Sequence, residues 1–504
     1  MKIKILNIYF LLPICVSALL GCNKTKSEYS TIDIYTSNDI HGQVDGDSES
    51  MDIVSYGTFM KNKGKEKNTL LIDSGDTWQG SIYSNHNYGA MINDIMCEAR
   101  FSARTIGNHD FDWGVEKLIA NTSREYNGYT IPVLAANVYD YTFDTKVVGN
   151  NQQTNIGQKT VTYTLDNGIK VGIVGVIGDN QITSITSFYM KQLTFTDHVQ
   201  VIKEEATKLR EEGCQVVIAS VHTGQDDVYG FGLSDYVDLV LCGHTHRLQS
   251  KVENGVYFAQ FGAYGEYIGH LKLTYSEKQK KVVNTEMEYF NKAGVKKELN
   301  NTYDTNILSI CNRYKEDCQS EASQVVANNV NGYFPKSDEA VNLMCKAVLD
   351  EVKKEGHEDV ILSYCNTGRN NLPNRSWTYA DLYESFPFDN KIIVAEIKGS
   401  DITREIKRYS NACIDDDFDG YYESNKTYKI ACIDYLLYHT NAYRDYDYFH
   451  TFDESTTVPL SKNYREILRD WLISEGYSEG KELNASDYLN SVHQFDKTRL
   501  IEID

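Results

Sequence analysis

Side chains that can bind a divalent cation recur along the first half of the chain, each directly after an apolar segment. Segments such as TLLID and VVIAS are short and rich in aliphatic or β-branched residues, which predicts buried strands. Imidazole, carboxylate and amide groups together suit a borderline divalent cation. The candidate ligands are Asp39, His41, Asp76, Asn108, His222, His244 and His246.

This set of candidate ligands is larger than one ion requires. One ion takes about four to six ligands, whereas two ions that share a bridging carboxylate would use the whole set. A single Asp-x-His or Gly-His-Thr-His motif also occurs in ordinary polar loops. Five such motifs in series, each after a predicted strand, favour a metal centre over a solvated loop edge.

One of these motifs, TIGNHDFDWG at residues 105–114, places three polar groups between two glycines. In isolation, Asn108, His109 and Asp112 would be ordinary turn residues, because Gly-Asn pairs mark turns. Their position in the series of strand-end motifs favours a part in the chemistry of the site instead.

The elements around the motifs predict an α/β fold. Apolar segments alternate with amphipathic stretches such as MINDIMCEARFSA, a pattern typical of sheets covered by helices. In such sheets, functional groups gather at the ends of strands. At 504 residues the chain is too long for one hydrophobic core, so we expect two or three domains.

The order of the motifs, D-x-H, GD-x-x-x-G, GNH-D/E-x-D, H-x-G and GHTH, resembles that of the calcineurin-like metallophosphoesterases. The segments LAANV and GAYGEYIGHLKL narrow the resemblance to the 5'-nucleotidase branch, which includes UDP-sugar hydrolases and 2',3'-cyclic phosphodiesterases. The resemblance is strong over residues 30–290 and loose over 330–504. It implies an N-terminal four-layer α/β/β/α metallophosphoesterase sandwich and a C-terminal α/β substrate-binding domain.

The resemblance also divides the candidate ligands between two divalent ions, which could be manganese, zinc, cobalt or iron. One ion would be bound by Asp39, His41, Asp76 and His246, and the other by Asp76, Asn108, His222 and His244. In this assignment His109 is not a ligand. It resembles the catalytic histidine of the family, with Asp112 as its hydrogen-bonding partner.

The chemistry implied by the resemblance is hydrolysis of a phosphate ester. Two divalent ions lower the pKa of water toward neutrality and draw charge from the phosphoryl oxygens. Attack would be in line, with inversion at phosphorus and no covalent enzyme intermediate. His109, as an imidazolium stabilised by Asp112, would donate to the oxygens on which charge develops.

The second half of the chain carries a looser copy of the family's substrate-binding residues. The segment VILSYCNTGR resembles the N-G-G-x-x-R substrate loop with one glycine missing, and KRYS supplies a second arginine. Relatives clamp the nucleobase between two aromatic residues, and the segments that carry them differ here. The candidate substrate-binding residues are Asn366, Gly368, Arg369, Arg408, Phe418 and Tyr448, with Tyr421 and Tyr446 as further candidate replacements in the clamp.

The segment SDEAVNLMCKAVLDEVKKEG predicts a helix in the second domain. Ser337 can cap its start and Gly356 can end it. An apolar stripe along one face predicts core packing. That stripe consists of Val341, Met344, Val348 and Val352.

The first residues, MKIKILNIYFLLPICVSALLGC, have the basic start and apolar stretch of a signal peptide, and LLGC resembles the lipoprotein processing box. We expect cleavage before Cys22, a lipid anchor on it, and a bacterial envelope location facing the periplasm or exterior. Plain secretion with an incidental cysteine is the alternative. The predicted organisation is signal peptide 1–21, tether 22–30, metallophosphoesterase domain 31–295, helical linker 296–325 and substrate domain 326–504.

The net charge of −21 argues against nucleic acid as an electrostatically bound partner. The predicted function is a 5'-nucleotidase that releases phosphate from nucleoside monophosphates. Hydrolysis of 2',3'-cyclic nucleotides or UDP-sugars on the same site is the alternative among enzymes, and a non-catalytic surface binding lipoprotein is the alternative of another class. A protein phosphatase is disfavoured, because a dedicated second domain would restrict access to the site.

Overall fold

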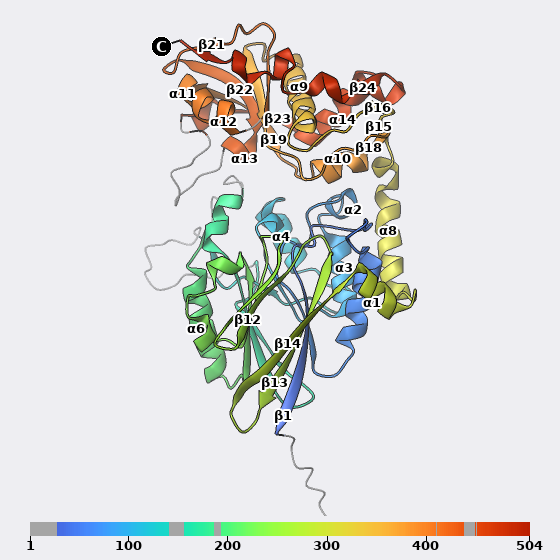
Figure 1. Ribbon diagram of the computed structural model, residues 1–504, viewed down its shortest axis with the longest axis vertical. Coiled ribbons are helices and arrows are strands. Elements are labelled where there is room, and N and C mark those ends of the chain that lie inside the picture. Colours follow the sequence, from blue (N-terminus) through green and yellow to red (C-terminus); the bar gives the residue numbers. More distant parts are fainter. Residues whose placement is uncertain are drawn as a thin grey trace, which may run out of the picture.

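The computed structural model describes residues 28–140, 156–185, 193–409, 411–437, 449 and 451–503. These residues form two domains, one above the other in Figure 1, joined along one side by a helical connector. The segment that carries the expected signal peptide, and Cys22 with it, lies outside the described residues. Within the described residues, no helix combines the length and the apolar character needed to cross a bilayer.

The first domain contains two six-stranded sheets. In the first sheet, β1 and β2 are parallel and β1 and β13 are antiparallel. In the second, β7, β9 and β10 are parallel. The first sheet has the order β14 (Lys281–Asn291), β13 (Tyr267–Ser276), β1 (Tyr29–Ser37), β2 (Thr69–Asp73), β3 (Ala103–Thr105), β4 (Val133–Leu134); the second has β11 (Leu248–Glu253), β12 (Val256–Phe261), β10 (Leu239–Cys242), β9 (Val216–His222), β7 (Lys170–Ile177), β6 (Thr160–Thr164).

The two sheets pack face to face, with helices on their outer faces (Figure 1). Ile34 of the first sheet and Ile218 of the second lie in one buried cluster between the sheets. Helices α1 (Ile53–Gly64) and α3 (Ala90–Ala99) cover the outer face of the first sheet, and α6 (His198–Glu211) covers that of the second. The predicted α/β/β/α sandwich is therefore confirmed.

The connector consists of α7 (Lys292–Leu299) and α8 (Thr305–Ala322). The connector is not only a polar link between the domains. Its residues Ile307 and Ile310 are buried in the core of the first domain beside α1 and α3. Helix α8 is thus docked on the first domain before the chain enters the second.

The second domain is built on a five-stranded mixed sheet with α9 (Glu339–Lys354) and α14 (Tyr464–Ser474) packed together beside it. The predicted apolar stripe of α9 is buried in this core. The helix start differs from expectation: Asp338 occupies the N-cap and makes no side-chain capping bond, while the Ser337 hydroxyl donates to the Asp338 carboxylate. The sheet has the order β20 (Asn411–Ile414), β17 (Val360–Cys365), β22 (Thr427–Ile433), β19 (Lys391–Lys398), β23 (Val458–Asn463).

Shorter elements complete the two domains. Helix α2 of the first domain lies against the second, where the Asn85 amide donates to the Pro387 carbonyl at 2.8 Å. These elements are α2 (Ile82–Asn85), α4 (Val115–Thr122), α10 (Tyr379–Ser385), α11 (Gly399–Asp401), α12 (Lys407–Tyr409), α13 (Asp434–Leu437), β5 (Val138–Asp140), β8 (Leu193–Phe195), β15 (Val325–Ala327), β16 (Asn329–Asn331), β18 (Trp377–Thr378), β21 (Tyr421–Tyr422), β24 (Glu482–Asn484) and β25 (Ile501–Glu502).

Candidate metal centre and active site

The candidate ligands converge at one edge of the sandwich because their strands end there. Parallel pairing places Ser37 of β1 opposite Asp73 of β2, and Ile177 of β7 opposite His222 of β9. The loops after β1, β2, β3 and β10 therefore start at neighbouring points, while His222 is itself the last residue of β9. The structure brings together all seven residues that the sequence singles out: Asp39, His41, Asp76, Asn108, His222, His244 and His246.

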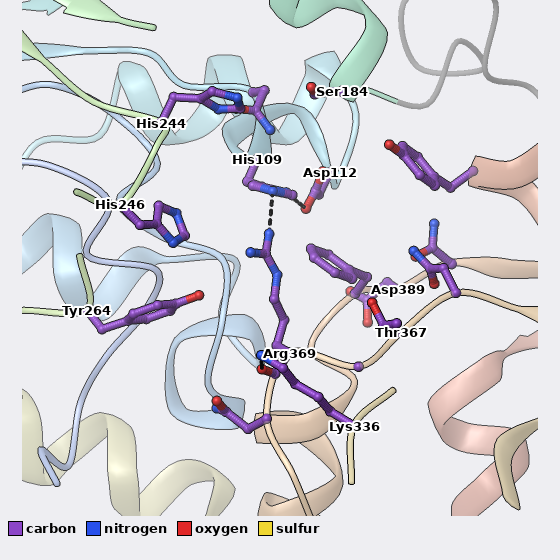
Figure 2. Close-up of a pocket in the computed structure, with 17 residues that line it drawn as sticks. His109, Asp112, Ser184, His244, His246, Tyr264, Lys336, Thr367, Arg369 and Asp389 are labelled. Atoms are coloured by element: carbon purple, nitrogen blue, oxygen red, sulfur yellow. Dashed lines mark hydrogen bonds and ion pairs between the residues drawn. The ribbon is translucent and has the colours of Figure 1, made fainter. Parts of the chain in front are cut away.

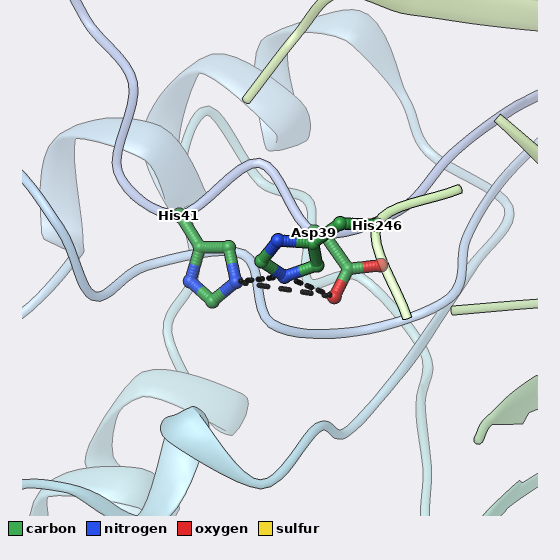
Figure 3. A group of neighbouring side chains, drawn as sticks. All are labelled: Asp39, His41 and His246. Carbon is green, nitrogen blue, oxygen red and sulfur yellow. Dashed lines mark hydrogen bonds and ion pairs between the residues drawn. The ribbon is translucent and has the colours of Figure 1, made fainter. Parts of the chain in front are cut away.

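The first group consists of Asp39, His41 and His246, shown in Figure 3. The Nε2 atoms of the two imidazoles lie 3.0 Å apart, and His246 Nε2 lies 3.5 Å from Asp39 Oδ1. His41 Nδ1 lies 3.3 Å from the Gln79 carbonyl, which leaves Nε2 to face the group. This is the orientation in which a second hydrogen bond fixes a histidine ligand for a metal.

The second group consists of Asp76, His222 and His244, with the Asn108 amide between the imidazoles. Asn108 Oδ1 lies 3.1 Å from His222 Nε2 and 3.0 Å from His244 Nδ1. His222 Nδ1 donates to the Ser74 carbonyl at 2.8 Å, so Nε2 faces the group. Two imidazole nitrogens, a carboxylate and an amide oxygen thus point at one small volume.

Asp76 lies between the two groups. Its Oδ2 atom is 3.8 Å from His41 Nε2 of the first group and 3.2 Å from His222 Nε2 of the second. Its Oδ1 atom accepts the His109 amide at 2.8 Å. The position before Asn108 must be glycine, because a Cβ on Gly107 would meet Asp76 Oδ1 at 2.2 Å.

The backbone around the ligands is held in an unusual conformation. Asp39, His41, Asp76, His244 and His246 all have a positive φ, between 49° and 74°. Such left-handed conformations are uncommon outside glycine and cost free energy that the surrounding structure must offset. Part of the compensation is visible: the His244 amide donates to the Asp39 carboxylate at 2.9 Å.

Burial and neighbouring charges set the protonation of the ligands. Burial lowers the pKa of His41 well below its usual range, despite the nearby Asp76 carboxylate. Burial, with the nearby His222, lowers the pKa of His244 to about 4. Burial also opposes charge on His222, but the Asp76 carboxylate outweighs it and raises the pKa of His222 to about 10. At neutral pH, His41 and His244 are therefore in the neutral form that binds metals.

The donor chemistry of both groups fits two divalent cations. Each group offers imidazole nitrogens and a carboxylate, all within 4.8 Å of one another, and Asp76 is placed to serve both. Where two imidazole nitrogens face one another with their lone pairs, the lone pairs repel each other unless a cation or a proton lies between them. Asp39, His41 and His246 thus form one candidate metal-binding group, and Asp76, His222 and His244 form the other, with Asn108 beside the second.

His109 and Asp112 form a hydrogen-bonded pair beside the metal centre. His109 Nδ1 lies 2.9 Å from Asp112 Oδ2, and the imidazole ring lies 5.3 Å from that of His41. Burial raises the pKa of Asp112, although the neighbouring His109 opposes the change. The pairing leaves Nε2 of His109 to point away from Asp112, on the side of the cavity.

A cavity of about 600 Å³ opens from this pair to the second domain (Figure 2). The first domain contributes His109, Asp112 and Tyr264 to its wall, and the second contributes Arg369 and Phe388 among others. The guanidinium of Arg369 reaches across, and its Nη2 atom lies 2.8 Å from His109 Nε2. The site is therefore completed by both domains.

The backbone of the second domain places Arg369. The Gly368 amide donates to the Lys336 carbonyl at 2.8 Å, and the Arg369 amide donates to the Ser385 carbonyl at 2.7 Å. A Cβ on Gly368 would meet that Ser385 oxygen at 2.9 Å, which explains the glycine. Asn366 and Gly368 line the cavity together with Arg369, as the resemblance of this loop implies.

Two other predicted substrate residues lie away from the cavity wall. Arg408 is exposed on α12, and among the described residues it is not part of the cavity wall. Phe418 packs beside Tyr428 against the core of the second domain, also away from the cavity wall as described. Tyr446 and Tyr448 lie outside the described residues.

Several residues of the cavity wall were not predicted from the sequence. In the first domain, one of them follows β7 and one lies between β12 and β13; in the second, they lie before α9, after β17, before β19 and in α13. The segment FPFDN was the available signal, because two aromatic residues, an acid and an amide precede a strand. The additional residues are Ser184, Tyr264, Lys336, Thr367, Asn370, Phe388, Asp389, Asn390 and Tyr435.

Comparison with known proteins agrees with both domains. Residues 33–248 match the calcineurin-like phosphoesterase family, and residues 323–422 match the 5'-nucleotidase C-terminal domain. The chain is 24% identical over 442 residues to endonuclease YhcR of Bacillus subtilis (strain 168), covering 80% of this chain and 35% of that protein. It is 26% identical over 347 residues to a 5'-nucleotidase of Diplobatis ommata, covering 62% of this chain and 56% of that protein.

The chain thus spans between about a third and just over half of the length of these two relatives. A crystal structure of a 5'-nucleotidase precursor from Thermus thermophilus has the same fold, with a TM-score of 0.68 at 18% identity over 90% of this chain and 97% of that one. The family matches place the phosphoesterase domain before the C-terminal domain, and the Thermus thermophilus structure aligns with the chain over both domains. The chain thus contains a calcineurin-like phosphoesterase domain followed by a 5'-nucleotidase C-terminal domain.

Proposed function

We propose that this protein hydrolyses phosphate monoesters and that nucleoside monophosphates are its substrates. The observation that carries the proposal is the convergence at one cavity of two metal-type ligand groups, the His109–Asp112 pair and Arg369. The two relatives named above support phosphate ester chemistry, since one is called a 5'-nucleotidase and the other an endonuclease.

The metal centre would be held by the seven candidate ligands. When bound, two divalent cations supply an activated water at neutral pH and neutralise charge on the phosphoryl group. Asp76 serves this centre twice, because one oxygen faces the ligand groups and the other fixes the His109 amide. A change at the metal centre is therefore transmitted directly to the backbone of the catalytic loop.

His109 and Arg369 act on the phosphoryl group from the side of the second domain. Asp112 holds Nδ1 of His109, and Nε2 accepts from Arg369 in the structure. In a protonated ring, Nε2–H would instead donate to an oxygen of the substrate. One positioned donor of this kind contributes roughly 3 kcal/mol to transition-state stabilisation. Arg369 meets His109 Nε2 in the structure and is thus within reach of the same oxygens.

The nucleoside portion would occupy the part of the cavity lined by the second domain. Asn366, Thr367 and Asn390 offer hydrogen-bonding groups there, and Phe388 and Tyr435 offer aromatic rings. Stacking of a base on an aromatic side chain contributes about 1 to 3 kcal/mol. An aromatic contact of this kind supports a preference for nucleotides over simple sugar phosphates.

Phosphate release from a panel of substrates tests the proposal. The panel contains nucleoside 5'-monophosphates, 2',3'-cyclic nucleotides, UDP-glucose and ribose 5-phosphate, each assayed with and without added manganese, zinc or cobalt. We expect metal-dependent release, with kcat/KM for adenosine monophosphate at least about tenfold above that for ribose 5-phosphate. Hydrolysis of cyclic nucleotides or UDP-glucose alone would replace the proposed substrate class, and binding without release would indicate a non-catalytic protein.

We also propose that the protein is anchored to a bacterial envelope membrane by acyl chains on Cys22. The support is the LLGC segment after an apolar stretch. Cys22→Ser should abolish acylation and release active protein from the membrane fraction, because a lipid anchor requires the thiol. Fractionation after a high-salt wash measures this, and retention of the Cys22→Ser protein in the membrane would contradict the anchor.

A further inference from the structure

An aspartate of the second domain connects its core to the loop that carries the catalytic histidine. The indole Nε1 of Trp113 donates to Asp389 Oδ2 at 3.0 Å, which links the two domains directly. The other oxygen of the same carboxylate accepts a short hydrogen bond from Arg465. Trp113 follows Asp112 in the chain, so this link is adjacent to the His109–Asp112 pair.

Arg465 holds the loop that presents Asp389. Its side chain is fully buried, and its guanidinium donates to the carbonyls of Phe386 at 2.9 Å and Phe388 at 2.8 Å. The ring of Tyr383 lies 3.4 Å from the guanidinium carbon. A buried arginine is costly unless it is paired and hydrogen-bonded. Nη1 and Nη2 of Arg465 make these bonds, while Nε has no hydrogen-bond partner among the described residues, so the loop around residues 386–389 is held by the two Nη atoms.

The same loop also touches the imidazole itself. The Phe388 ring stacks on the His109 ring, with the centroids 5.1 Å apart and the planes 22° apart. Trp113, which belongs to the same loop as His109, packs edge-on against Tyr88 of the first domain, with the ring centroids 5.7 Å apart. The catalytic loop is therefore held between its own domain and a rigid loop of the second domain.

We propose that Asp389 is a positioning residue. Its bond to Trp113 and the contact of Phe388 with His109 hold the imidazole of the His109–Asp112 pair in its working orientation. The second domain then contributes to the chemical step as well as to substrate binding. This inference rests on the proposed phosphoester hydrolysis.

Trp113→Phe is the test variant, because it removes the indole donor while keeping an aromatic ring and leaving the Asp389–Arg465 pair intact. We expect kcat to fall by about tenfold with little change in KM, since a displaced catalytic group slows the chemical step. The loss should be equal for adenosine monophosphate and p-nitrophenyl phosphate, because the link acts on His109 and not on the nucleoside.

Trp471→Phe is the matched control. The indole of Trp471 also donates to an aspartate, Asp350, at 2.9 Å, but both residues lie within the second domain. This variant loses the same type of hydrogen bond and should keep the wild-type kcat. A similar fall in both tryptophan variants would mean that the effect is one of general stability, and would overturn the proposal.

A His109→Ala background locates the effect. If the link acts through His109, Trp113→Phe should not slow the residual turnover of the His109→Ala protein. NMR gives a readout that does not depend on turnover. The His109 resonance is identified as the one that disappears in the His109→Ala protein. It should shift in Trp113→Phe and stay in place in Trp471→Phe. Full kcat in Trp113→Phe, an added loss in the His109→Ala background, or an unmoved His109 resonance would each overturn the proposal. Failure of the proposed function is recognised separately, by wild-type protein that releases no phosphate from nucleotides.

Discussion

Asp76 is the carboxylate that lies between the two ligand groups. It faces both ligand groups and accepts the backbone amide of His109. Nearby His222 and His109 hold the pKa of Asp76 well below its usual range, although its burial acts in the opposite direction. Asp76 is thus charged at every pH at which the protein would work, as a bridging ligand must be.

Asp76→Asn and His109→Ala should therefore differ in a measurable way. The first should lower metal content and nearly abolish turnover, because it removes the charge shared by both ligand groups. The second should retain both metals and slow turnover by roughly a hundredfold or more, since it removes one donor to the transition state. Metal analysis and phosphate release on the same samples measure both effects. Loss of metal from His109→Ala would mean that a ligand has been mistaken for a catalytic group.

At the scale of single residues, the sequence predicted the members of the two ligand groups but few of the residues that line the cavity. The ligands directly follow short apolar strands, so their convergence could be expected from parallel pairing alone. Phe388 and Asp389 meet His109 and Trp113 from another domain, more than 270 residues further along the chain. Local patterns contain no information about such contacts. Phe418 illustrates the limit, because its aromatic character equally suits the core position that it occupies.

At the scale of elements, helix α6 begins at a buried histidine with two hydrogen-bonding partners. His198 Nδ1 lies 2.8 Å from Asp179 Oδ1, and its Nε2 lies 3.2 Å from the Asp227 carbonyl. Burial opposes charge on His198, but the bond to Asp179 outweighs it and raises the pKa of His198. The same bond lowers the pKa of Asp179. Both ring nitrogens have acceptors, which favours the protonated imidazole.

This pair predicts a pH-dependent contribution to stability. A histidine with a raised pKa stabilises the folded state fully below about pH 6.5, and the effect is lost as the pH rises through its folded pKa. The Asp179 contribution is present above about pH 3.9 and is lost on acidification. His198→Gln should therefore lower the melting temperature more at pH 5.5 than at pH 8.5. The exposed His493 offers a control as His493→Gln, and an equal shift of His198→Gln at both pH values would contradict the assignment.

Other elements show why their details escape prediction. The period of the apolar residues correctly identified the buried face of α9, because the core requires that face whatever the cap. The cap itself depends on the turn before the helix, where the Asp338 carboxylate is occupied by Ser337 and Asn490. Helix α8 is mostly polar in sequence, yet Ile307 and Ile310 near its start are enough to dock it on the first domain.

At the scale of the whole molecule, the metal ligands belong to one domain and the substrate-binding groups mainly to the other. Arg369 and Phe388 both contact His109, and Asn85 of α2 binds the carbonyl of Pro387 beside them. Residues of both domains therefore complete the site. Two domains were predictable from length and motif order, whereas the contacts between them join residues far apart in the sequence.

Metal titration of the chelator-treated protein, with phosphate release from adenosine monophosphate as the readout, is the decisive experiment for the two-metal site. We expect no turnover without metal, and activity that rises with added manganese, zinc or cobalt until two equivalents are bound per chain. Wild-type turnover by metal-free protein, or full activity with a single bound ion, would contradict the two-metal site.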